Sequence, residues 1–148
     1  MLRNKKLNYN FFIIQLRCDD DMMWLFFLKV KNDILNVILT NIKLERFEIK
    51  SFKYNLDNIQ AIEFDILQCF NNIIAVKDKI YIVCENEYKK DDLIKKYMRK
   101  LSLRITDIID YHSFKILIKE FCKNDTSGCL KLIDDNLNDK TSYEIIKN

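Results

Sequence analysis

Two periodicities of apolar residues divide the chain into predicted helices and strands. In residues 57–73 the apolar side chains recur at steps of three and four, which predicts a helix with one buried face. These side chains are Ile59, Ile62, Ile66, Phe70 and Ile73. Asp57 or Asn58 is a plausible cap for its first turn. Similar patterns predict helices over residues 88–101, 113–123 and 127–137.

The other apolar runs are short or alternating, which is typical of β-strands. The predicted strands cover residues 22–30, 34–39, 44–52, 80–84 and 103–109. The first of these runs also fits a short helix capped by Asp21. Residues 3–17 fit a helix, although residues 11–14 within them fit a strand equally well. The run at residues 80–84 is apolar on both faces, as expected for a strand in a parallel sheet with both faces covered.

The order of these elements predicts an α/β fold. Strands come first, and strands then alternate with helices, so we expect an antiparallel hairpin joined to parallel strands by crossover helices. No internal repeat or Gly/Ser/Pro-rich linker divides the sequence, which predicts a single domain over residues 1–148. Asn and Asp occupy the predicted turns, because both tolerate turn conformations.

Composition removes several classes of function. The 148 residues include one Gly, no Pro and one His, which excludes phosphate-binding glycine loops and two-histidine zinc motifs. The net charge of +3 is too balanced to indicate a partner by itself. Five scattered cysteines without a C-x-x-C pair favour free thiols in a reducing compartment. With no apolar run long enough for a membrane span, we expect a cytoplasmic protein with no membrane partner.

One small set of charged residues suggests metal-dependent chemistry. Asp33 opens a predicted strand, and Glu48 and Lys50 lie two residues apart on the next strand, so their side chains share one face. If the two strands form a hairpin, Asp33 can approach Glu48. Two carboxylates provide the oxygen ligands that Mg²⁺ prefers, and Lys50 can hold an attacking water molecule.

This arrangement resembles the PD-(D/E)xK nucleases, which have the restriction-endonuclease-like fold. The matching residues are Asn32-Asp33, the strand around Glu48-Ile49-Lys50, the helix from about Asp57 and the strand 79–84, within residues 30–110. The resemblance implies a restriction-endonuclease-like core and an Mg²⁺- or Mn²⁺-dependent nuclease that hydrolyses phosphodiester bonds in DNA. It implies that Asp33 and Glu48 are metal ligands and that Lys50 is the catalytic lysine. Two positions depart from the family pattern. Asn32 replaces the nominal proline, and the first helix lacks the Glu that would match the acidic residue of many members, since no Glu precedes Glu45.

A second feature is the Lys-rich face of the helix predicted over residues 88–101. Its candidate nucleic-acid-binding residues are Lys89, Lys95, Lys96, Arg99 and Lys100. They can contact DNA phosphates without reading the base sequence, although a solvated surface has the same composition. The alternative function is a non-catalytic intracellular protein-binding module, of the immunity or viral adaptor type. A chain this small also favours a homodimer or a protein partner for specific recognition.

Overall fold

The computed structural model describes residues 23–42, 44, 47–85, 87–121 and 127–138. The side chains of residues 47, 87–91 and 121 fall outside this description. The element predicted at residues 3–17 and the acidic turn Asp19–Asp21 lie outside the described residues, so those two predictions stay untested.

The described part of the chain is mixed α/β, in agreement with the predicted fold class. Its strands are β1 (Met23–Lys31), β2 (Ile34–Asn41), β3 (Phe47–Lys53), β4 (Lys79–Cys84) and β5 (Asp107–Asp110). Its helices are α3 (Ile59–Ile73), α4 (Glu87–Tyr97), α5 (Arg99–Ser102), α6 (Tyr111–Phe121) and α7 (Ser127–Leu137). The prediction of antiparallel strands joined to parallel strands is confirmed by the strand pairings.

The five strands form one mixed sheet in the order β3-β2-β1-β4-β5. β1, β2 and β3 pair antiparallel, whereas β4 pairs parallel with both β1 and β5. The central strands β1 and β4 are buried over most of their length. Burial on both faces accounts for their nearly continuous apolar sequences, because such strands have no solvent-facing side to alternate.

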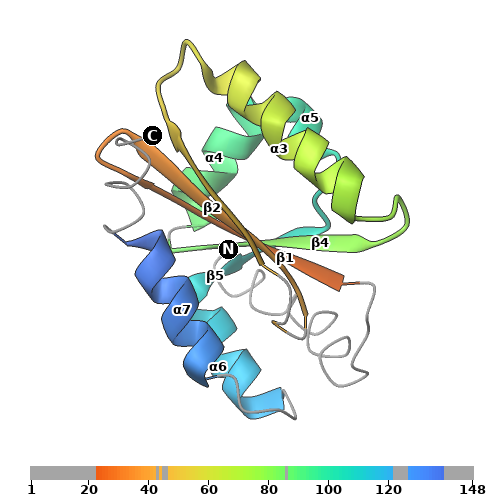
Figure 1. The fold of residues 1–148 in the computed structure, drawn as a ribbon, viewed down its shortest axis with the longest axis vertical. Helices are drawn as coiled ribbons and strands as arrows, with labels where there is room; N and C mark the ends of the chain where they lie inside the picture. Colours follow the sequence, from red (N-terminus) through yellow and green to blue (C-terminus); the bar gives the residue numbers. More distant parts are fainter. Residues whose placement is uncertain (1–22, 43, 45–46, 86, 122–126, 139–148) are drawn as a thin grey trace.

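Helices cover both faces of the sheet, which gives three layers (Figure 1). The apolar residues of α3, α4 and α5 pack with one set of strand side chains, including Phe26 and Ile82. Those of α6 and α7 pack with the other set, including Phe27 and Val83. Consecutive strand residues therefore contribute to opposite cores, as the period of two requires.

The turn between β1 and β2 shows how the chain bends without glycine. Asn32 and Asp33 have φ angles of 50° and 62°, the left-handed values that a two-residue hairpin turn needs at both central positions. Asn and Asp adopt this conformation more readily than other non-glycine residues. Asp33 therefore has a structural reason for its position, independent of any metal chemistry.

Two predicted elements differ from the structure. The single helix predicted over residues 88–101 is broken at Met98, whose side chain is buried, so that α5 begins a new short helix. The strand predicted over residues 103–109 is shorter, because Leu103 is exposed and the Arg104 N–H donates to the Leu101 carbonyl in a turn. In both cases packing and turn formation interrupt a continuous apolar pattern.

None of the helices in the described residues combines the length and the apolar character that crossing a membrane would require. Cys84 is buried, Cys69 and Cys129 are partly buried, and none of these three described cysteines forms a disulfide. The prediction of free thiols is thus confirmed for these three residues.

Candidate functional site

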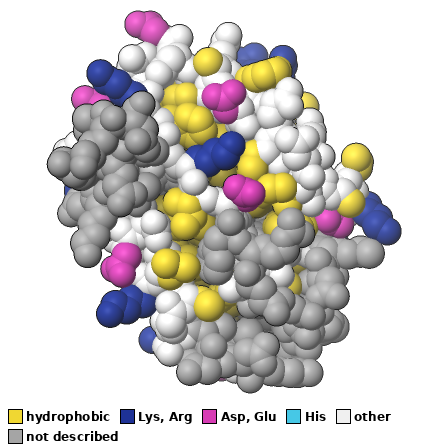
Figure 2. All heavy atoms as spheres, viewed as in Figure 1, with side chains coloured by type: hydrophobic (Ala, Val, Ile, Leu, Met, Phe, Trp, Pro, Cys, Tyr) yellow, Lys and Arg dark blue, Asp and Glu magenta, His cyan; other side chains and the backbone are white. Residues whose placement is uncertain are grey.

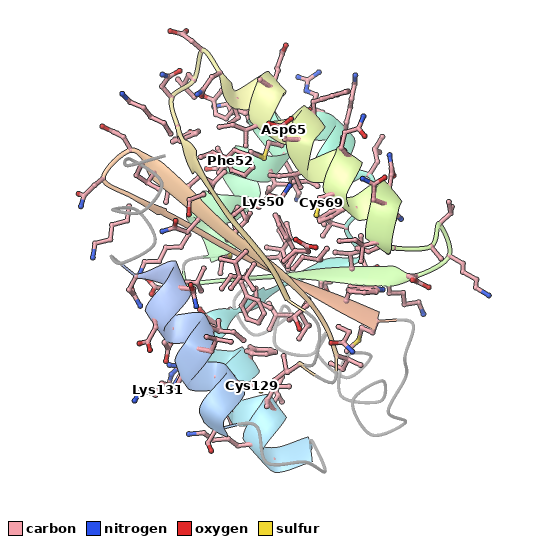
Figure 3. The ribbon with its side chains drawn as sticks, viewed as in Figure 1. Lys50, Phe52, Asp65, Cys69, Cys129 and Lys131 are labelled. Carbon is pink, nitrogen blue, oxygen red and sulfur yellow. The ribbon has the colours of Figure 1, made fainter. Side chains whose placement is uncertain are left out.

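Glu48 and Lys50 lie together on the face of β3 that is turned toward α3. Opposite them on β2 are Leu39 and Val37, and all four side chains line a small cavity of about 10 Å³ with Cys69 of α3. Figure 3 shows Lys50 and Cys69 in the space between this strand and helix, beside Phe52. The predicted same-face arrangement of Glu48 and Lys50 is therefore present.

Burial and two neighbouring charges determine the pKa of the Cys69 thiol. Partial burial raises its pKa above the ordinary value, Lys50 partly opposes the shift, and Glu48 adds to it. At neutral pH the thiol is therefore protonated and a weak nucleophile. Figure 2 shows the face of the molecule seen in this view, where basic and acidic side chains are set among exposed hydrophobic ones. This environment is unsuited to an activated cysteine.

Asp33 does not join Glu48 and Lys50. The register of the hairpin pairs Leu39 with Glu48, whereas the Tyr54 N–H donates to the Asp33 carbonyl at 2.7 Å. Tyr54 lies six residues after Glu48, which corresponds to about 20 Å along a strand at ~3.4 Å per residue. Asp33 and Glu48 thus occupy opposite ends of the hairpin, and the expected approach of their carboxylates is absent.

The two carboxylates expected to hold magnesium are not brought together by the hairpin of β2 and β3. Among them, no group of three or more His, Cys, Asp or Glu side chains is placed to hold a metal ion. Mg²⁺ needs near-octahedral oxygen coordination, for which proteins usually supply one or two carboxylates beside water and phosphate. On this face of the hairpin Glu48 supplies one carboxylate beside Lys50, and Asp33 supplies none.

The predicted basic face separates into two parts around the break at Met98. Lys96, Arg99 and Lys100 line a cleft of about 570 Å³ between α3, α4 and α5. Lys95 lines a different depression, toward β5. The side chain of Lys89 lies outside the described residues. The structure therefore brings three of the five predicted nucleic-acid-binding residues to one cleft.

Aromatic side chains flank these three cations. Phe64 from α3 and Tyr97 from α4 line the same cleft and are 61% and 39% exposed. Gln60 and Leu67 of α3 complete the wall formed by that helix, together with Glu63. The cleft therefore offers positive charge and exposed aromatic rings side by side.

Glu63 is the acidic residue that lines this cleft, and its carboxylate accepts a hydrogen bond from the protein backbone. Its side chain is only 6% exposed, and its carboxylate accepts the Leu101 N–H at 2.8 Å. Leu101 is the third residue of α5, so Glu63 satisfies a free N–H in the first turn of that helix. Glu63 offsets one of the three positive charges that line the cleft, so the formal charge of the lining stays positive.

The sequence interpretation missed the aromatic contribution of Phe64 and Tyr97. Phe64 lies outside the apolar stripe of α3, so its sequence position indicates an exposed aromatic residue on the polar face. Tyr97 falls at the apolar spacing of the helix predicted over residues 88–101, which predicts burial, yet it is 39% exposed beside the helix break at Met98. Phe64 could have been found from sequence, but the exposure of Tyr97 depends on the helix break.

A second polar group lies at the carboxyl ends of the parallel strands. Lys29 of β1 forms an ion pair with Glu85, with Nζ and Oε1 2.9 Å apart, and also donates to Asn138. The hydroxyl of Tyr111 donates to Asp134 of α7, and burial followed by this hydrogen bond raises the tyrosine pKa well above its ordinary value. The contact between Lys29 and Asn138 joins the end of α7 to β1, and the contact between Tyr111 and Asp134 joins α6 to α7, so both have a structural role.

No protein-family model matches the sequence, and no curated protein matches it at a significant level. The assignment of a function therefore depends on the geometry of the chain itself.

Proposed function

We propose that the protein binds single-stranded nucleic acid in the cleft between α3, α4 and α5. The observation that carries this proposal is the meeting of Lys96, Arg99 and Lys100 with the exposed rings of Phe64 and Tyr97. Proteins that bind single strands combine a cationic groove for the backbone with aromatic side chains on which bases stack. A cleft of about 570 Å³ is also large enough for a ligand of nucleotide size.

The same arrangement favours a single strand over a duplex. Phe64 and Tyr97 can stack only on bases whose faces are free, and the bases of a duplex already stack on one another. The cations supply contacts that do not depend on sequence, since phosphates are the same at every position. We therefore expect binding with little base preference, and stronger binding to single strands than to the corresponding duplex.

Replacing Phe64 with alanine tests the stacking part of this proposal. Each stacked base contributes about 1–3 kcal/mol, so Phe64→Ala should weaken binding about 5- to 150-fold. The salt dependence should stay the same, because no charge is removed. Fluorescence anisotropy of a labelled oligonucleotide of about 15 nucleotides measures both quantities.

Ile116→Ala is the matched control, because Ile116 is an exposed apolar residue on α6, in the other helical layer. It should leave the affinity unchanged. Equal affinities for wild type and Phe64→Ala, or equal losses in both alanine variants, would contradict stacking at this cleft.

Phosphodiester hydrolysis is a second candidate function, favoured by the shared face of Glu48 and Lys50. It predicts cleavage of DNA in the presence of Mg²⁺ or Mn²⁺, measured on single-stranded and plasmid substrates. Glu48→Gln and Lys50→Ala should each abolish the cleavage. Because Asp33 lies at the far end of the hairpin, Asp33→Asn should leave it unchanged. Intact substrates with wild-type protein would exclude hydrolysis and leave binding as the function.

A further inference from the structure

The outer edge of β3 offers a row of backbone hydrogen-bonding groups. β3 is the end strand of the sheet, the gold strand in Figure 1, and within the described residues no strand pairs with its outer side. Tyr54 donates its N–H toward β2, and the unbroken register makes Phe52, Lys50 and Glu48 follow the same orientation. In an antiparallel pair the alternate residues point the other way. The backbone groups of Ile49 and Ser51 therefore face outward.

The side chains of this edge carry opposite charges at a regular spacing. Glu48 and Lys50 are exposed on the α3 face, and Ile49 between them is 37% exposed on the opposite face. A strand with this pattern is complementary to a second copy of itself in one antiparallel register. Exposed strand edges also provide a ready template for pairing with another chain.

We propose that two copies of the chain form a dimer by antiparallel pairing of their β3 strands about a two-fold axis at Ile49. This register places Glu48 opposite Lys50 of the second copy, and Lys50 opposite Glu48 of the second copy. Ile49 meets its own counterpart at the axis, where the two residues exchange both N–H···O bonds. The two sheets then continue into one, with the α3 helices on the same face.

Other registers of the same pairing are less favourable. A two-fold axis perpendicular to the sheet puts the same face of both sheets on the same side. Two residues that lie opposite one another must therefore have side chains on the same face. An axis at Lys50 places two ammonium groups opposite each other, and an axis at Glu48 places two carboxylates opposite each other, both of which are destabilising. An axis at Ser51 places Lys50 opposite Phe52 and Glu48 opposite Tyr54, so neither charge has an oppositely charged partner. Among the axes at residues 48–51, charge complementarity therefore selects the one at Ile49.

Charge reversal tests both the dimer and its register. Light scattering after size-exclusion chromatography should give wild type a mass of twice 17.9 kDa. In Glu48→Lys or Lys50→Glu both pairs become repulsive, so the dissociation constant should rise on the order of tenfold or more. An equimolar mixture of the two variants restores both pairs, as does the double variant E48K/K50E, and each should recover the dimer. A monomeric wild type, or a double variant no better than the single ones, would overturn the proposal.

Two further variants separate pairing from misfolding. Ile49→Pro removes an outward N–H that β2 does not use, so circular dichroism should stay native while the dimer dissociates. Lys131→Glu reverses an exposed charge on α7, seen in Figure 3, and should leave the dimer intact. A dimer that persists in Ile49→Pro would overturn the proposal. The nucleic-acid cleft contains no residue of β3, so either proposal can fail without the other.

Discussion

Replacing Phe27 with alanine should lower the free energy of unfolding by about 3–5 kcal/mol. Phe27 is fully buried in the central strand β1, between the sheet and the layer of α6 and α7. Its ring packs edge-on against Phe114 and Tyr111, with centroids 5.2 and 6.1 Å apart. The substitution removes these contacts and leaves a cavity that a closely packed core fills only in part. Urea denaturation followed by circular dichroism measures the change.

Phe64→Ala is the control, since it makes the same chemical change at a side chain that is 61% exposed. It should alter the free energy of unfolding by less than about 1 kcal/mol, because most of the ring is already in contact with water. Similar losses in the two variants would contradict the assignment of Phe27 to the core and of Phe64 to the surface. The result also shows whether weaker nucleic-acid binding by Phe64→Ala reflects the cleft or the fold.

Removing the three cations of the cleft should weaken binding strongly and also change its salt dependence. Three phosphate contacts on a single strand give a salt slope of about −2, so the triple variant K96Q/R99Q/K100Q should bind about 50-fold more weakly near 0.15 M salt. The slope itself should fall toward zero as the phosphate contacts disappear. Anisotropy titrations at several salt concentrations measure both effects.

A second triple variant, K77Q/K119Q/K131Q, removes the same net charge from exposed lysines outside the cleft. It should keep most of the affinity and nearly all of the salt slope, because distant surface charges are screened beyond about 10 Å at moderate salt. If both triple variants lose affinity equally, binding depends on the overall charge of the protein and not on the cleft. The free energy of unfolding should change little in either variant, since all six side chains are exposed.

The comparison of Asp33 with Lys96 shows where sequence interpretation succeeds and fails. The hairpin of β2 and β3 was predicted, but in any antiparallel hairpin the start of one strand faces the end of the next. Asp33, in the turn just before β2, therefore faces Tyr54 and not Glu48, so the predicted hairpin keeps the two carboxylates apart. Lys96 and Arg99 were grouped on one predicted helix face, and both line one cleft with α3 although the helix is broken between them at Met98.

Local pattern alone determined the buried stripe of α3, the strand β4 and the turn at Asn32-Asp33. Helical periodicity, burial on both faces and left-handed turn conformations depend on residues within a few positions of one another. The tertiary structure alone decided which distant side chains meet: Phe64 beside Lys96, and Glu63 at the start of α5. Those meetings depend on strand register and helix docking, where a small shift costs little locally but moves a side chain by many ångströms.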